Sequence, residues 1–232
     1  MKTRLCHRPP SRHPRAVKRL LFSVVALSSV LFASALAAPD ARPLLAAATL
    51  PAWEFITPEK TAPAATVCTP QSDGSLLCAG TPTGFLATTA THADYALHLE
   101  WRWTAKPGNG GVLLHITTGP RDRAWPVSFQ VQTKHKAVGD LLPMAGATFA
   151  EPLTSAPNTT PTKARLAADS ERPAGEWNCC DIVCRGDTIT VTVNGVEQNR
   201  VTGTSARAGR IGLQFEGAPF AVRALTLTPL AD

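Results

Sequence analysis

A two-residue alternation of apolar and polar side chains runs through several short segments of this chain. In YALHLEWRW, residues 95–103, leucine and tryptophan occupy alternate positions and His, Glu and Arg lie between them. The same period occurs in residues 127–134, 188–195 and 210–217. Successive side chains of a β-strand point to opposite faces, so this period predicts strands with one buried face. Many such strands, separated by Gly, Asn, Asp and Pro, predict antiparallel sheets packed face to face.

Three cysteines, Cys179, Cys180 and Cys184, lie within six positions after a tryptophan. Residues 177–184 have the pattern of a further strand, which would form a hairpin with residues 188–195. Cysteines four apart on a strand are roughly 13 Å apart, and adjacent ones point to opposite faces. The paired Cys-x-x-Cys spacing of structural zinc sites is also missing. We therefore interpret all three as small apolar core residues and expect no metal site here.

The N-terminus has the layout of an export signal. Seven Lys and Arg residues and no acid occur in positions 1–19, and an apolar run from Leu20 to Ala37 ends in small residues suited to cleavage. Cleavage is expected before Ala38, and the protein would be secreted or periplasmic. A retained anchor is the alternative, because 18 apolar residues are near the lower limit for crossing a bilayer. The expected organisation is a signal peptide (1–38), a linker (39–52) and one domain (53–232).

The basic charge of the chain belongs to this N-terminal segment. The sequence has 23 Lys and Arg against 17 Asp and Glu, and removal of residues 1–38 leaves 16 basic and 17 acidic residues. Nucleic-acid binding depends on clustered cations that neutralise phosphates. We therefore expect no nucleic-acid partner, and no membrane contact beyond the export signal.

Another pair of cysteines, Cys68 and Cys78, lies symmetrically about an Asp-Gly turn signature. The two would face each other across a hairpin. An exported protein meets an oxidising compartment, where a structural disulfide would form. Two free thiols are the alternative.

Several motifs together resemble one family. Gly-Glu-Trp-Asn at 175–178, Asn-Gly at 194–195 and Gly-x-Ile-Gly-Leu-Gln followed by Glu-Gly at 209–217 occur in that family's order and spacing. With the stretches before them, they make residues 53–230 resemble the 3-keto-disaccharide hydrolase domain. The resemblance implies an all-β antiparallel sandwich (jelly roll) of the concanavalin-like lectin/glucanase type.

The resemblance also implies an exported enzyme whose partner is a carbohydrate, a glycoside oxidised to a ketone at C3. Such a ketone acidifies the C2 proton, so a base can remove it and the glycosidic oxygen leaves by β-elimination, after which water adds. This route needs a base near C2, donors for the enolate oxygen and an acid for the leaving oxygen. It differs from the paired-carboxylate route of ordinary glycosidases. No cofactor is implied, and the use of a divalent cation is left open.

The sequence departs from the family's motifs at positions that bear on catalysis. The family's Asn-Ser-Gly-Val-x-x-Arg begins here at Asn109 and ends at His115, and its Glu-x-Gln is Gln130 and Gln132. Arg223 is retained near the C-terminus. Because an amide cannot act as a base, a non-catalytic carbohydrate-binding domain is the alternative function. If the chain is an enzyme, restoring Glu at 130 and Arg at 115 is expected to raise turnover.

The remaining polar side chains of the strands are the candidates for a sugar groove. For catalysis we select Glu100, His135 and Asp140. The alternatives are that Glu100 pairs with Arg102 on the sheet, that His135 is a surface or hydrogen-bonded histidine, and that Asp140 caps the long loop. Trp101 and Trp103 are expected in the core. The expected substrate contacts are Asn109, His115, Trp125, Gln130, Gln132, Gln214, Glu216 and Arg223. Motif order and strand parity predict that Asn109, His115, Gln130 and Gln132 share one concave face.

Overall fold

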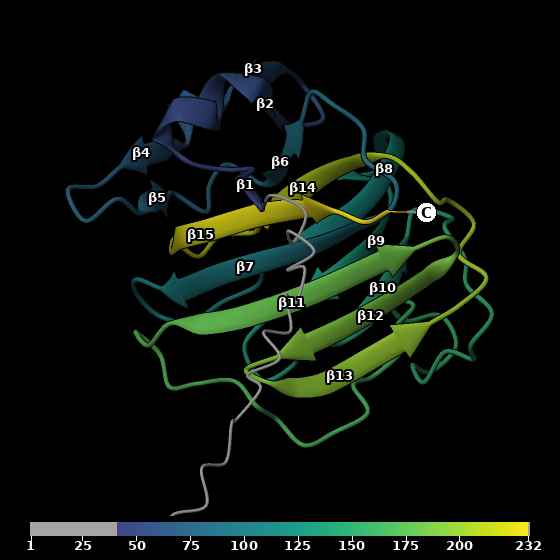
Figure 1. Ribbon diagram of the computed structural model, residues 1–232. Helices are drawn as coiled ribbons and strands as arrows, with labels where there is room; N and C mark the ends of the chain where they lie inside the picture. Colours follow the sequence, from purple (N-terminus) through teal and green to yellow (C-terminus); the bar gives the residue numbers. More distant parts are fainter. Residues whose placement is uncertain (1–40, 232) are drawn as a thin grey trace, which may run out of the picture. The chain divides into compact units, whose positions relative to one another are not determined.

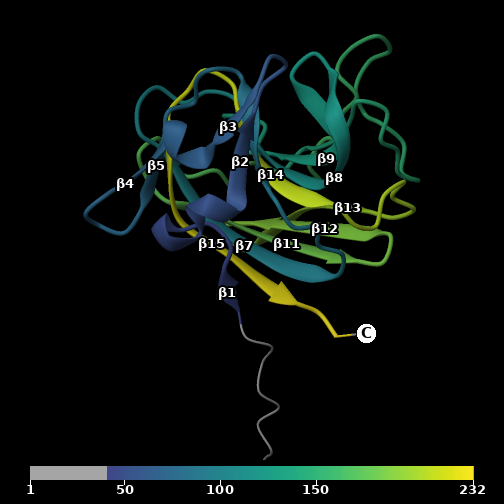
Figure 2. The same ribbon diagram turned by 90° about the horizontal axis from the view of Figure 1, so that it is seen from above.

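The computed structural model describes residues 41–231, which form two antiparallel sheets packed face to face (Figures 1 and 2). The first sheet contains, in spatial order, β13 (Val196–Val201), β12 (Thr188–Val193), β11 (Asn178–Arg185), β7 (Tyr95–Trp103), β15 (Phe220–Pro229), β5 (Leu76–Cys78) and β4 (Cys68–Pro70), with β1 (Arg42–Pro43) also paired to β15. The second contains β10 (Leu141–Met144), β9 (Trp125–Gln132), β8 (Gly111–Asp122), β14 (Arg210–Phe215), β6 (Gly84–Thr88), β2 (Trp53–Ile56) and β3 (Thr61–Pro63). The predicted all-β sandwich is confirmed.

Strand parity decides which side chains enter the core. Along β7 the odd-numbered residues are buried and the even-numbered ones are partly exposed, as the alternation predicted. The other three alternating segments lie in β9, β12 and β14. Trp101 and Trp103 are buried between the sheets, as expected.

Aromatic rings connect the two sheets through the core. Phe55 and Phe215 of the second sheet have ring centroids 5.2 Å apart, and Phe215 lies 5.3 Å from Phe220 of the first sheet. Trp103 meets Phe220 edge-on at 6.4 Å. Such pairs contribute about 0.5–1.5 kcal/mol each beyond the apolar area they bury, so this row fixes how the sheets face each other.

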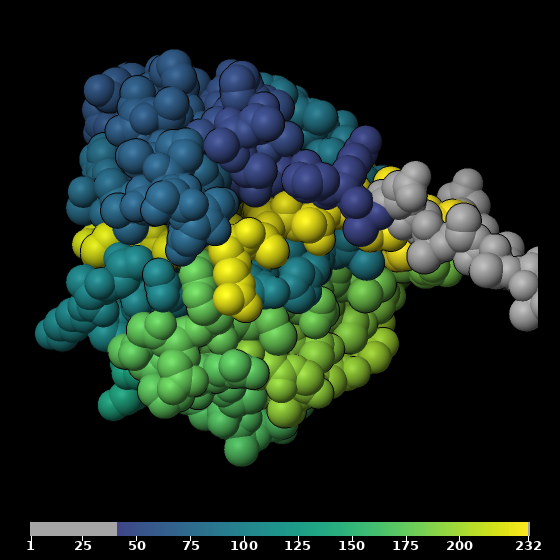
Figure 3. Space-filling model, turned by 60° about the vertical axis from the view of Figure 1, so that its left-hand side comes forward, coloured from purple at the N-terminus to yellow at the C-terminus, as the bar shows by residue number. Residues whose placement is uncertain are grey.

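The N-terminal residues of the described chain belong to the sandwich. Arg42 and Pro43 pair with β15, and the helix η1 (Ala47–Ala52) follows. Leu45 and Leu50 lie in the main core. The space-filling view shows yellow β15 between these N-terminal segments, in blue and purple, and the teal and green middle of the chain (Figure 3). The expected linker at 39–52 is therefore wrong for residues 42–52, while the expected signal peptide lies outside the described residues.

The segment between β10 and β11 has no strand of its own, yet its backbone is anchored. Leu141 and Lys163 exchange two backbone hydrogen bonds of 3.0 and 2.8 Å, and Leu166 N donates to Gln198 O at 2.7 Å. The buried amide of Asn199 donates to the carbonyls of Gly139 and Lys163, both at 3.1 Å. These bonds hold the segment along β10 and β13. Within residues 41–231, no helix is long and apolar enough to cross a membrane.

The cysteines divide between the core and the surface. β11 forms the predicted hairpin with β12 and pairs with β7 on its other side. Cys180 and Cys184 are fully buried, whereas Cys179 is partly exposed on the opposite face. The interpretation as core residues is confirmed for Cys180 and Cys184 and wrong for Cys179. Cys68 and Cys78 face each other across β4 and β5, with Sγ atoms 2.6 Å apart, and both are free in this structure.

Native alkylation should distinguish these thiols. We expect Cys179 to react first while Cys180 and Cys184 stay unmodified, because burial excludes the reagent and raises the pKa of the Cys184 thiol to about 12, and only the thiolate is nucleophilic. Timed alkylation followed by peptide mass spectrometry measures this order, with denatured protein as the control. Equal labelling of Cys179 and Cys184 in native protein would contradict the burial of β11.

Candidate functional site

A groove of about 830 Å³ opens on the outer face of the second sheet. Its volume lies within the range of about 300–1,000 Å³ usual for ligand sites. Strands β8, β9, β10 and β14 contribute its floor and one end, and residues 158–162 of the long segment form part of its wall. The segment between β10 and β11, which has no strand of its own, is therefore part of the candidate site.

Strand parity places a row of amides on the floor of this groove. Gln130 and Gln132 alternate along β9 with Phe129 and Val131, which are buried in the core. Gln214 occupies the equivalent position on β14. All three amides line the groove, as the sequence predicted.

The floor amides form one hydrogen-bonded chain that ends at a carboxylate. Nε2 of Gln130 donates to Oε1 of Gln132 at 2.8 Å and to Oε1 of Gln214 at 2.6 Å. Nε2 of Gln214 then donates to Oε2 of Glu216 at 2.7 Å. Nδ2 of Asn109 donates to the same oxygen of Glu216, also at 2.7 Å. Asn109 and Glu216, both expected from the sequence, therefore meet in the groove.

Glu216 is the carboxylate at the centre of this arrangement. It follows β14 directly, lines the groove and is exposed to it. Partial burial raises the pKa of its carboxyl group, and the positive charges of Lys134 and Arg123 act in the opposite direction. Both amide donors reach Oε2, so Oε1 accepts neither of these bonds, and Lys134 and Arg123 influence the carboxylate electrostatically. Such a group can accept a proton from a bound ligand.

One wall of the groove is apolar. Trp125 packs with Ala124, Leu142 and Met144 in a small cluster separate from the main core, and three of these residues line the groove. The aliphatic face of a sugar ring packs well on such a surface next to amides that bind its hydroxyls. Trp125 therefore lies where the sequence placed it.

Glu100 and Arg223 lie on the other side of the molecule. They belong to β7 and β15 of the first sheet, and their side chains form an ion pair on its outer face. Arg223 also lies over the ring of Trp177, with 4.6 Å between its guanidinium carbon and the ring centroid. Placing either residue in the groove is wrong, because the even-numbered face of β7 points away from the second sheet. Glu100 does pair on the sheet, but with Arg223 and not with the expected Arg102.

The expected position of the His115 side chain is also wrong. It is 1% exposed, its Nδ1 lies 3.0 Å from the carbonyl oxygen of Ala206, and its ring meets Tyr95 and Phe129 edge-on. Its φ of 51° falls where the pairing of β8 is irregular. Without the bulge, His115 would face the same side of the sheet as Leu113. At the bulge this alternation is reversed, so the imidazole points into the sandwich. His115 therefore does not share the face of Gln130 and Gln132.

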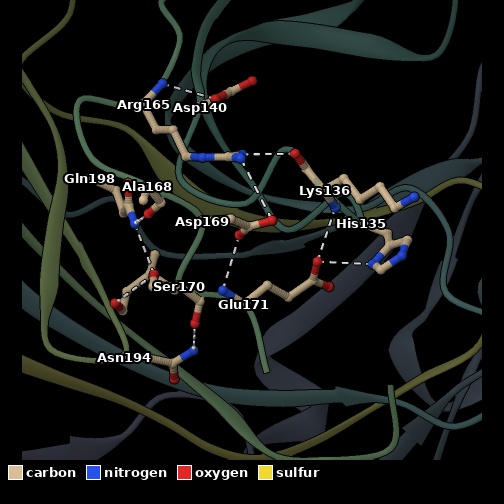
Figure 4. Close-up of polar contacts among 11 residues, drawn as sticks. His135, Lys136, Asp140, Arg165, Ala168, Asp169, Ser170, Glu171, Asn194 and Gln198 are labelled. Carbon is tan, nitrogen blue, oxygen red and sulfur yellow. Dashed lines mark hydrogen bonds and ion pairs between the residues drawn. The ribbon is translucent and has the colours of Figure 1, made fainter. Parts of the chain in front are cut away.

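The two other catalytic candidates anchor the long segment (Figure 4). His135 Nδ1 lies 2.9 Å from Oε2 of Glu171, and His135 does not line the groove. Oδ1 of Asp140 accepts a 2.9 Å hydrogen bond from the backbone N–H of Arg165. This contact corresponds to the alternative in which Asp140 caps the loop. Asp140 also lines the groove, and burial raises its pKa. It therefore combines a structural contact with a place in the site.

The groove contains further charged residues that sequence reasoning did not select. Lys134 lies two residues after Gln132, so the alternation that places Gln130 and Gln132 on one face predicts the same face for Lys134. Arg121 lies at the end of β8 and Arg123 in the β8–β9 turn, and only the folded hairpin brings them to the groove. Among residues 41–231, no cluster of three or more His, Cys, Asp or Glu side chains is placed to hold a metal ion.

Comparison with known families now adds to this geometry. The family model described as the 3-keto-alpha-glucoside-1,2-lyase-like domain matches residues 40–228. The chain belongs to this family. The match includes both sheets, the amide floor and Glu216, and it confirms the family that the sequence motifs resembled. A search of curated proteins finds no match.

Solved structures with the same fold come from carbohydrate-related and uncharacterised proteins. A protein from Parabacteroides distasonis, provisionally assigned as a glycosyl hydrolase, is 18% identical with a TM-score of 0.59, covering 82% of this chain and 100% of that one. A Bacillus subtilis protein of unknown function with a galectin-like fold is 12% identical with a TM-score of 0.54, covering 82% and 94%. The carbohydrate-binding module CBM66 from Bacillus subtilis is 11% identical with a TM-score of 0.52, covering 77% and 96%. At these identities the likeness shows the fold.

The buried imidazole of His115 predicts an acid-dependent loss of stability. Burial lowers its pKa, so the folded protein binds fewer protons than the unfolded chain, whose histidine pKa is about 6.5. The stabilising contribution is full above about pH 6.5 and is lost as the pH falls through the folded pKa. We expect the free energy of unfolding to fall less between pH 7.5 and pH 5 in His115→Gln than in the wild type. Urea unfolding followed by tryptophan fluorescence measures both, and equal falls would contradict the neutral buried ring.

Proposed function

We propose that this protein cleaves glycosides whose sugar carries a ketone at C3, and that the groove of the second sheet is its active site. The observation that carries the proposal is the hydrogen bonding of the Glu216 carboxylate and its exposure to the groove. Asn109 and Gln214 donate to one of its oxygens at 2.7 Å, and the carboxylate is open to a groove of sugar-binding size. Membership of the family supports the substrate class.

The proposed chemistry needs one base and two kinds of proton donor. Glu216 takes the proton from C2, the C2–H electron pair forms the C1=C2 double bond, and the C1–O bond breaks with its electrons going to the departing oxygen. Water then adds across C1=C2 to give the free 3-keto sugar. In this addition the water oxygen bonds to C1, the proton held by Glu216 goes to C2, and the water proton goes to the groove acid that protonated the leaving oxygen.

Two groove residues suit the donor roles. Lys134 lies close enough to influence Glu216 electrostatically and can donate to the C3 oxygen as negative charge develops on it. Asp140 lines the same groove with a raised pKa, which favours the protonated form that the leaving oxygen requires. Gln132 and Trp125 would bind the sugar hydroxyls and its apolar face.

A carbohydrate-binding domain without catalysis is the second candidate. Gln130 favours it, because an amide occupies the position where the family's motif has a carboxylate. Under this alternative the amide floor and Trp125 would bind a sugar, and Glu216 would serve only as a hydrogen-bond acceptor.

Turnover of a chromogenic 3-keto-glucoside, compared with the unoxidised glucoside, separates the two candidates. We expect the purified protein to release the aglycone only from the oxidised substrate. Glu216→Gln should lower kcat by about 10²-fold or more, the usual contribution of a general base. The matched control is Glu100→Gln, which removes a carboxylate from the opposite sheet and should leave kcat unchanged. Sugar binding by calorimetry without turnover would favour the binding domain, and full activity in Glu216→Gln would exclude that residue as the base.

We also propose that the protein is exported and that Cys68 and Cys78 form a disulfide after export. The layout of the N-terminus supports the first part, and the direct opposition of the two thiols in β4 and β5 supports the second. We expect the exported protein to begin near Ala38 and to show the two-hydrogen mass loss of a Cys68–Cys78 bond. N-terminal sequencing and unreduced peptide mass spectrometry measure both. An intact Met1, or alkylation of both thiols after denaturation without a reductant, would contradict the respective part.

A further inference from the structure

Gln130 does not reach Glu216 directly, but one amide connects them. Gln130 donates to Gln214 at 2.6 Å, and Gln214 donates to Glu216 at 2.7 Å. Gln130 and Gln214 are 1% and 3% exposed. An unpaired buried polar group destabilises the fold, so the orientation of each amide constrains the next. Gln130 acts through its NH2 group, because its Oε1 is buried without a hydrogen-bond partner.

The ionised carboxylate of Glu216 at one end and the NH2 group of Gln130 at the other favour the same direction of the chain. An ionised carboxylate can only accept hydrogen bonds, so Gln214 turns its NH2 group toward Glu216 and its oxygen toward Gln130. That oxygen needs a donor, which Gln130 provides with its own NH2 group. The second hydrogen of the same NH2 group goes to Gln132. Gln130 can make both contacts only because it carries an amide rather than a carboxylate.

We propose that Gln130 is the positioning residue for Glu216: it fixes the orientation of Gln214, so that Glu216 keeps two N–H donors on Oε2 and turns Oε1 to the groove. The inference rests on the proposed function only where Glu216 is called the base. The arrangement of donors around Glu216 is open to test in the absence of substrate.

A carboxylate at position 130 would reverse this chain. It would accept from both neighbours, so Gln214 would turn its NH2 group toward position 130 and its oxygen toward Glu216. Glu216 would then lose a donor, face a carbonyl oxygen and lie one amide away from a second negative charge. Each change disfavours the ionised form of Glu216. The substitution that restores the family's motif should therefore impair this protein, contrary to what the motif alone suggested.

The test is the titration midpoint of Glu216, followed by carbon NMR of full-chain protein carrying 13C-labelled glutamate. The Glu216 signal is assigned by its loss in Glu216→Gln. We expect the midpoint to rise in the order wild type, Gln130→Met, Gln130→Glu. Methionine removes the donor without adding charge, and glutamate reverses the chain. Loss of a hydrogen bond to a charged group corresponds to a rise of about one to two pH units in Gln130→Glu.

Controls separate this inference from general damage and from the proposed function. Glu100, on the opposite sheet, should titrate identically in all variants, and fluorescence-monitored melting reports whether each is folded. If Gln130→Glu does not fold, Gln130→Met still tests the inference, and an unchanged Glu216 midpoint in the folded variants would overturn it. If the wild type turns over 3-keto-glycosides, the acidic limb of kcat/KM should shift upward by the same amount in Gln130→Glu. If no variant has turnover but the midpoint shifts as expected, the proposed function fails and the positioning role stands.

Discussion

Burial of one face of each sheet against the other is the constraint on which the rest of this structure depends. The row from Phe55 through Phe215 and Phe220 to Trp103 joins the layers, and every strand that crosses it must send alternate side chains outward. Polar residues therefore lie on the two outer faces. A side chain at an outward position turns inward only where a bulge interrupts the alternation. His115 shows the exception, because a positive φ in β8 turns its ring inward.

The two outer faces have opposite characters. On the first sheet, Arg102 and Arg223 lie over Trp177 with guanidinium carbons 4.7 and 4.6 Å from the ring centroid, and Glu100 pairs with Arg223. These side chains contact one another across the outer face of that sheet. On the second sheet, the amides bond along the floor, and the long segment between β10 and β11 forms a wall beside them. Asp140 and Asn199 anchor that segment through hydrogen bonds to its backbone.

The use of amides on the floor has an electrostatic consequence. Two neighbouring carboxylates in a partly buried groove disfavour each other's ionisation, whereas an amide both donates and accepts. Gln130, Gln132 and Gln214 therefore leave a single floor carboxylate, Glu216, at the end of the chain. Lys134 and Arg123 offset its partial burial. Because Gln130 stands where the family's motif has an acid, the floor has one charge fewer than that motif implies and keeps the charge of Glu216.

The sequence by itself determined the sandwich, the bounds of β7, the hairpin of β11 and β12, and the facing of Gln130, Gln132 and Gln214, because a period of two is a local property of the backbone. It also indicated the family, through motifs that lie on those strands. Only the tertiary structure decided that Glu100 and Arg223 lie on the other sheet, since alternation tells inward from outward but does not tell one outer face from the other. The inward turn of His115, the bond from the Arg165 N–H to Asp140 and the chain from Gln130 to Glu216 likewise depend on contacts between residues distant in sequence. No local pattern contains the geometry of such contacts.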